Sequence, residues 1–150
     1  MAIDLELLKK LREETQASVA DVKNAVEEAA GNYEKAKDLL RKRGVEIAEK
    51  KAQRETSQGL VESYVHGNGK IGVLVKLSCE TDFVARTEEF KNLAHEIAMQ
   101  VSAMDPKDVK SLLSQEYIRD PKFTISDLVK EAVGKLGENI KVAEFSRIEL

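Results

Sequence analysis

Residues 1–44 carry apolar side chains at helical spacing in three successive segments, which predicts three short helices. Ser18 and Asn32 stand where the second and third helices would need N-caps, and Gly31 and Gly44 suit helix ends. We expect these helices to form a compact N-terminal three-helix module over residues 1–44. The three apolar stripes are Ile3, Leu7, Leu8 and Leu11; Val22, Ala25, Val26 and Ala29; and Tyr33, Ala36, Leu39 and Leu40.

Residues 45–56 are strongly charged, and their acidic and basic side chains are interleaved. This pattern predicts a solvated linking helix rather than an RNA-binding surface, because no net basic face results.

From residue 57 the pattern changes to alternating β-rich runs around a Gly-Asn-Gly turn at residues 67–69, which predicts a β-hairpin. An amphipathic helix follows Thr87, and Pro106 suits the first position of a shorter helix. The segment "TISD" is a capping box for another helix that ends at Gly137, and the tail from residue 140 is a candidate third strand. We therefore predict an α+β fold, in which residues 57–150 form a small antiparallel sheet covered by helices.

Residues 78–86, "SCETDFVAR", form the least ordinary stretch, and we call it the knuckle. It follows a run that reads as a buried strand, yet it mixes Glu80, Thr81 and Asp82 with Phe83 and Val84. Buried packing of Phe83 under the strand end is the plain structural interpretation, but the adjacent acids make burial there unfavourable. We therefore favour an exposed binding surface.

The composition narrows the classes of function. The chain has 150 residues, 42% hydrophobic and 34% charged, with a net charge of -3, which argues against a nucleic-acid or membrane-surface binder. No apolar run approaches the roughly 20 residues that span a bilayer. The lone Cys79 rules out an internal disulfide framework and favours a cytoplasmic protein.

Sequence features of an active site are missing. Neither His66 nor His95 has a metal-ligand partner at useful spacing, and "GNGK" at residues 67–70 lacks the spacing of a phosphate-binding loop. We expect no cofactor, no metal site and no enzymatic activity, so that function would come from binding surfaces. A small metabolic enzyme is the disfavoured alternative.

Several segments of the chain resemble elongation factor Ts. They are "LREETQASVADVKNA" from residue 11, "CETDFVAR" from residue 79, "TEEFKNLAHEIAMQVSAMDP" from residue 87 and "GENIKVAEFSRIEL" from residue 137. The family's N-terminal signature commonly reads Thr-Gly-Ala-Gly, whereas Gln16 and Ser18 replace the glycines here. The chain has room for one core subdomain, so it resembles a short-form member with a ubiquitin-associated-like helical module.

The resemblance implies a guanine nucleotide exchange factor that binds elongation factor Tu with GDP. In the family, the Thr-Asp-Phe-Val segment enters the nucleotide domain and dislodges magnesium, so that GDP leaves and GTP binds. By position these residues are Thr81, Asp82, Phe83 and Val84, with Phe83 as an apolar wedge.

Two further expectations concern surfaces. Val19 is a candidate second contact with elongation factor Tu, and the alternative is a hydrophobic staple of its helix. A chain with a single core copy leaves a small sheet uncovered. We therefore expect a non-covalent homodimer through residues 70–78 and the C-terminal strand. On oxidation, a disulfide between the two copies of Cys79 is possible in such a dimer. The alternative function, based on the helical module alone, is a ubiquitin-associated-type peptide-binding adaptor.

Overall fold

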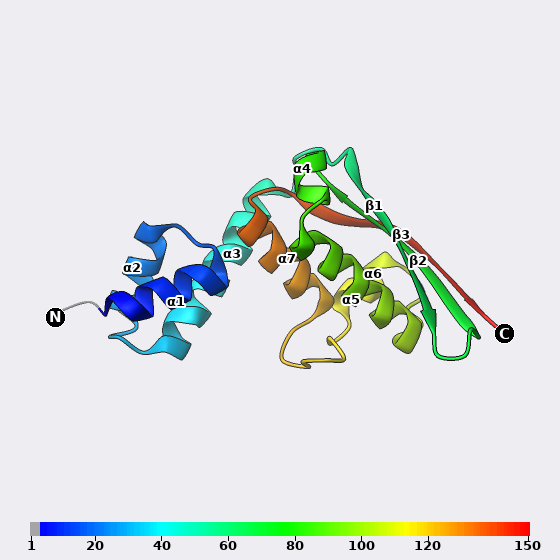
Figure 1. The fold of residues 1–150 in the computed structure, drawn as a ribbon, viewed down its shortest axis with the longest axis horizontal. Coiled ribbons are helices and arrows are strands. Elements are labelled where there is room, and N and C mark those ends of the chain that lie inside the picture. Colours follow the sequence, from blue (N-terminus) through cyan, green and yellow to red (C-terminus); the bar gives the residue numbers. More distant parts are fainter. Residues whose placement is uncertain (1–3) are drawn as a thin grey trace.

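The computed structural model of the chain describes residues 4–150, so the predicted contribution of Ile3 to the first helix lies outside the described residues. Figure 1 shows a helical module at the N-terminal end, one long helix leading away from it, and a sheet packed with helices at the other end. Within residues 4–150, no helix is both long and apolar enough to cross a membrane.

The N-terminal module consists of α1 (Leu5–Thr15), α2 (Val19–Glu28) and the first half of α3 (Tyr33–Lys51). The predicted caps are confirmed: Ser18 Oγ accepts from Asp21 N at 3.1 Å, and Asn32 Oδ1 accepts from Lys35 N at 3.0 Å. Such caps satisfy backbone donors that the first helical turn leaves unpaired. The module has its own small core of Leu11, Val22, Ala25, Val26, Ala29, Ala36 and Leu40.

Helix α3 differs from the prediction, which ended the third helix near Gly44 and began a separate linking helix that ran to residue 56. Instead α3 is one helix of 19 residues through Gly44, and it ends at Lys51. Gly44 therefore lies inside the helix, beside a neighbouring helix that is described below. The division into domains at residues 1–44, 45–56 and 57–150 stays a prediction.

The sheet has three antiparallel strands in the order β1 (Gln58–His66), β2 (Ile71–Cys79) and β3 (Ile140–Glu149). The hairpin joins His66 to Ile71, as the Gly-Asn-Gly turn predicts. Alternation gives β2 a buried inner row of Val73, Val75, Leu77 and Cys79. The predicted C-terminal strand is confirmed as β3, so the α+β fold class is confirmed.

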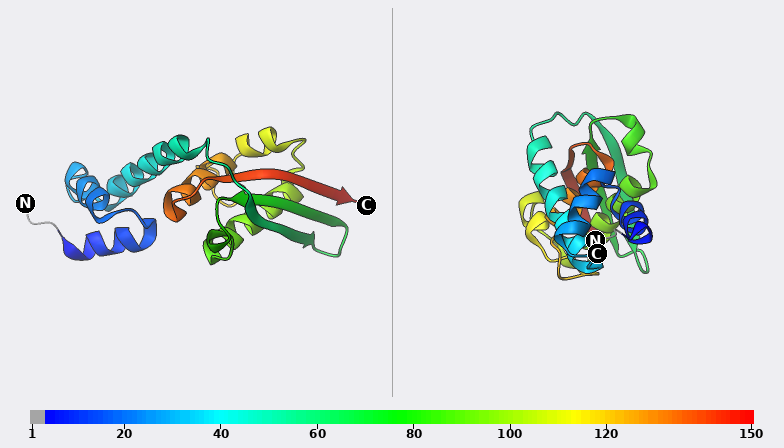
Figure 2. Two further views of the ribbon diagram at one scale, coloured as in Figure 1. Left: turned by 90° about the horizontal axis from the view of Figure 1, so that it is seen from above. Right: turned by 90° about the vertical axis from the view of Figure 1, so that its left-hand side faces the viewer.

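Four helices complete the fold: α4 (Asp82–Ala85), α5 (Glu88–Met104), α6 (Val109–Ser114) and α7 (Ile125–Leu136). The predicted capping box of α7 is present. Pro106 does not begin α6, because Asp108 is the N-cap and accepts from Ser111 N at 2.7 Å. The apolar faces of α5 and α7 pack on one side of the sheet, which leaves the other side open (Figures 1 and 2).

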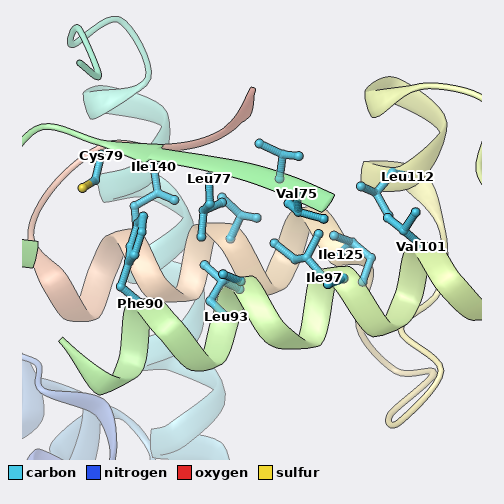
Figure 3. Close-up of a cluster of buried hydrophobic side chains, with 14 of the residues drawn as sticks. Val75, Leu77, Cys79, Phe90, Leu93, Ile97, Val101, Leu112, Ile125 and Ile140 are labelled. Carbon is cyan, nitrogen blue, oxygen red and sulfur yellow. The ribbon is translucent and has the colours of Figure 1, made fainter. Parts of the chain in front are cut away.

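Cys79 ends β2 on the inner face of the sheet, where its side chain is fully buried (Figure 3). Its Sγ donates to Thr81 O at 3.1 Å. A thiol that faces the core lies away from the outer face of the sheet, so this position disfavours the Cys79–Cys79 link that is possible on oxidation. Burial raises the pKa of the Cys79 thiol above its ordinary value, and the charge of Glu138 adds to the rise.

The buried thiol should be nearly inert in the folded protein. Thiol reagents attack the thiolate, which is both shielded and disfavoured here. We expect Cys79 to react with Ellman's reagent at least about tenfold more slowly in native protein than in concentrated guanidinium. The higher pKa also shifts the onset of reaction to higher pH than for a small free thiol. Equal rates in the two conditions would contradict the buried position.

Candidate functional site

The knuckle places one large apolar side chain in the solvent. It leaves the end of β2, and Asp82–Ala85 then form the single turn of α4. The Phe83 side chain is 83% exposed, whereas Phe90, seven residues later, is fully buried. The exposure of Phe83 therefore comes from the local backbone and not from a lack of core nearby.

The sequence explains how this turn forms. Thr81 has an extended backbone and caps α4, with its Oγ1 accepting from Val84 N at 3.4 Å. Ala85 is buried and Val84 packs partly against the main core, so these two residues anchor the turn. Asp82 and Phe83 then lie on the opposite, outward side, because four residues complete about one helical turn.

Two carboxylates fix the knuckle to the segment between α7 and β3. The Glu138 side chain accepts from Thr81 N at 2.9 Å through Oε1 and from Thr81 Oγ1 at 2.6 Å through Oε2. In the opposite direction, Glu80 Oε2 accepts from Asn139 N at 2.7 Å. Hydrogen bonds to a carboxylate are stronger than those between neutral groups. We call this reciprocal arrangement of residues 80–81 and 138–139 the clasp.

The clasp also holds the end of α3. The buried side chain of Asn139 donates from Nδ2 to Arg54 O at 2.7 Å and to Ala52 O at 3.4 Å. Arg54 Nη1 lies 3.7 Å from Glu80 Oε2, and Lys51 Nζ donates to Gly137 O at 2.7 Å. Three segments that are far apart in the chain are thus joined at the base of the knuckle.

The sequence predicted the knuckle but not the residues that support it. Glu138, Asn139 and Arg54 had no predicted role, although two of them lie in the recognised "GENI" segment. A signal was present, because a half-buried acid directly after a buried strand needs donors. The sequence could not say which donors would reach Glu80.

The exposed acid of the knuckle, Asp82, forms an ion pair with Arg86 one turn later. Both side chains are largely exposed, at 75% for Arg86 and 53% for Asp82, so the pair is worth little in water. Asp82 is therefore readily available to another partner. An exposed phenyl ring beside an available carboxylate on a fixed turn is suited to binding a protein surface.

Val19, the candidate second contact, lies at the first position of α2 and is 61% exposed. It borders a shallow groove of about 150 Å³ with Leu8, Arg12 and Val22. This exposure favours a surface anchor over a staple. Figure 1 places α2 and α4 in different parts of the molecule, so the structure brings Thr81, Asp82, Phe83 and Val84 together but leaves Val19 apart from them.

The turn before α2 shows why glycine suits the family's signature. Gln16 ends α1 with φ 55° and ψ 16°, in the left-handed region that favours glycine. Its side-chain Nε2 donates to Glu13 O at 2.9 Å, which helps to hold this conformation. In this chain the left-handed position is thus occupied by a residue other than glycine. Ser18, the other replacement, has an ordinary extended backbone and acts as the N-cap.

Comparison with known proteins gives the same assignment across both halves of the chain. A sequence profile described as Elongation factor TS matches residues 80–150. A protein named Elongation factor Ts from Caldanaerobacter subterraneus subsp. tengcongensis is 42% identical over 192 residues, which covers 98% of this chain and 96% of that protein.

Two other relatives carry the same name. The one from Fervidobacterium nodosum is 40% identical over 195 residues, covering 100% of this chain and 99% of that protein. The one from Thermotoga petrophila is 42% identical over 193 residues, covering 100% and 97%. These alignments are longer than 150 residues, so the relatives contain segments that this chain lacks. With such identities over nearly its whole length, the chain belongs to the elongation factor Ts family of translation factors.

Proposed function

We propose that this protein is a guanine nucleotide exchange factor that binds elongation factor Tu with GDP and releases the nucleotide. The observation that carries the proposal is the position of Phe83, which is 83% exposed on a turn that the clasp holds in place. Full burial of a phenyl side chain contributes about 1.5–3 kcal/mol. A protein surface that receives Phe83 gains this energy, and a turn already in its bound shape loses little entropy on binding.

In this proposal Phe83 enters a gap in the nucleotide domain of elongation factor Tu and moves the groups that hold magnesium. The magnesium ion neutralises the diphosphate, so its displacement weakens GDP binding. Asp82 first separates from Arg86, which costs little for an exposed pair, and then competes for polar groups near the ion. Thr81 and Val84 keep the turn in position.

Exchange of this kind needs no chemistry from the chain itself, so we propose that it is not an enzyme in the usual sense. A factor that prefers the empty partner over the GDP form must lower GDP affinity by the same ratio. GTP then binds because it is abundant. This function places the protein in the cytoplasm with the translation machinery.

The N-terminal module supplies the second contact in our proposal, through Val19 and its groove. A peptide-binding adaptor of the ubiquitin-associated type would need the module alone. Relatives that cover 98–100% of the chain favour a function for both halves together.

We also propose a homodimer through the open face of the sheet. Strand register places Val65 and Ile148 on either side of Gly72 on this face, with Leu74 one row away. Their side chains are 64%, 76% and 51% exposed, an apolar group that a second copy would cover. A two-fold contact between identical sheet faces meets this need with one surface.

The direct test is release of labelled GDP from a matched elongation factor Tu. Catalytic amounts of this chain should accelerate release, and excess magnesium should reduce the effect because it restores the displaced ion. No acceleration at micromolar concentrations would end the proposal.

Phe83→Ala should abolish most of the acceleration while it leaves the melting temperature nearly unchanged, because the ring is exposed. Phe90→Ala is the matched control: its ring is fully buried, so the same truncation should cost about 3–5 kcal/mol of unfolding free energy. Thermal melts and GDP-release rates on the two variants separate the roles. Intact exchange by Phe83→Ala would remove the wedge from the mechanism.

Leu74→Asp should shift the dimer toward the 16.7 kDa monomer in sedimentation equilibrium, because it places a charge in the proposed apolar contact. Ile118→Asp is the control, since Ile118 is also exposed but lies in the segment between α6 and α7. A wild-type mass of 16.7 kDa at tens of micromolar would refute the dimer.

A further inference from the structure

Helix α3 belongs to two cores at once. Ala36 and Leu40 lie in the core of the module, whereas Ala48 lies in the main core beneath the sheet. At 1.5 Å per residue the 19-residue helix is about 28 Å long, and no loop interrupts it. The module therefore takes its position from the way in which α3 packs on the main core.

That packing is centred on two glycines. A Cβ atom added to Gly134 of α7 would lie 3.1 Å from Gly44 Cα and 3.7 Å from Gly44 O. These neighbours are backbone atoms, so a side chain at residue 134 would push the two helices apart by a few tenths of an ångström. A Cβ added to Gly44 would meet nothing within 4 Å. A side chain would therefore be crowded at residue 134 of α7 but not at residue 44 of α3.

Other contacts align the same face of α3 with the main core. The Arg41 guanidinium lies 4.3 Å from the centre of the Phe123 ring, and Lys51 Nζ reaches Gly137 O. Among residues 4–150, no hydrogen bond or ion pair joins α1 or α2 directly to α7. The turn between α1 and α2 instead faces α7 across a cavity of about 470 Å³. The position of the module thus depends on the contacts that α3 makes with α7 and the main core (Figure 2).

Both glycines have an energetic cost, since glycine inside a helix is less stable than alanine by roughly 1 kcal/mol. We propose that the Gly44–Gly134 crossing is a spacer that positions the module contact at Val19 relative to the knuckle at Phe83, and so sets the affinity for elongation factor Tu. This inference rests on the proposed function. Two contacts on one rigid body strengthen each other only when both reach the partner at the same time. Displacement of the module would therefore lower the affinity of the whole chain for elongation factor Tu, although the knuckle itself stays intact.

Gly134→Ala, Gly134→Val and the control Gly44→Ala test the spacer, because the same Cβ is crowded on one helix and unhindered on the other. In GDP release from elongation factor Tu, Gly134→Val should raise the half-saturating concentration of this chain about tenfold. The maximal rate should stay unchanged, because the knuckle is intact. Gly134→Ala should show a smaller rise, and Gly44→Ala none. If Gly134→Val does not fold, Gly134→Ala decides the test.

The position of the module is measured separately, with spin labels at Glu28→Cys in the module and Glu89→Cys in the main body, both exposed sites. The label distance should change in the Gly134 variants and not in Gly44→Ala. An unchanged distance, or a changed distance with an unchanged half-saturating concentration, would overturn the spacer. A wild-type chain that does not accelerate GDP release would instead overturn the proposed function. The label distances would still show whether a side chain at residue 134 displaces the module.

Discussion

The clasp between Glu80, Thr81, Glu138 and Asn139 is the interaction on which the rest of the site depends. It joins the end of β2 to the start of β3 through charge-assisted hydrogen bonds, and Asn139 extends it to the end of α3. Half-buried carboxylates are costly unless they have donors, and here both oxygens of Glu138 and Oε2 of Glu80 accept hydrogen bonds. The knuckle is therefore fixed from below, so that Phe83 can stay exposed above it.

This arrangement separates stability from binding. The main core is made by residues such as Phe90, Leu77 and Ile97 between the sheet and its helices (Figure 3). Phe83 contributes nothing comparable to that core, since most of its surface remains in water. An exposed apolar ring is unfavourable in the isolated protein, and in the proposed function a partner covers it. The same reasoning applies to Val19 and to the open face of the sheet.

Helix α3 gives the separate surfaces a common frame. It has no flexible joint between the module and the main body, and it is held by packing at Ala48, by backbone contact at Gly44 and by Lys51. The small core of the module alone would be marginally stable. Because α3 also packs in the larger core, the folding of the module is coupled to the folding of that core.

The sequence by itself determined the local structure and the family. The caps at Ser18, Asn32 and Thr124 and the alternation along β2 act over a few residues, so they are visible in one dimension. Only the tertiary structure decided features that depend on distant partners. Gly44 looked like a helix end because glycine usually weakens helices, yet α3 continues through it and packs there against Gly134 of α7. The supporting role of Glu138 and the inward position of Cys79 likewise follow from long-range packing, which no local pattern encodes.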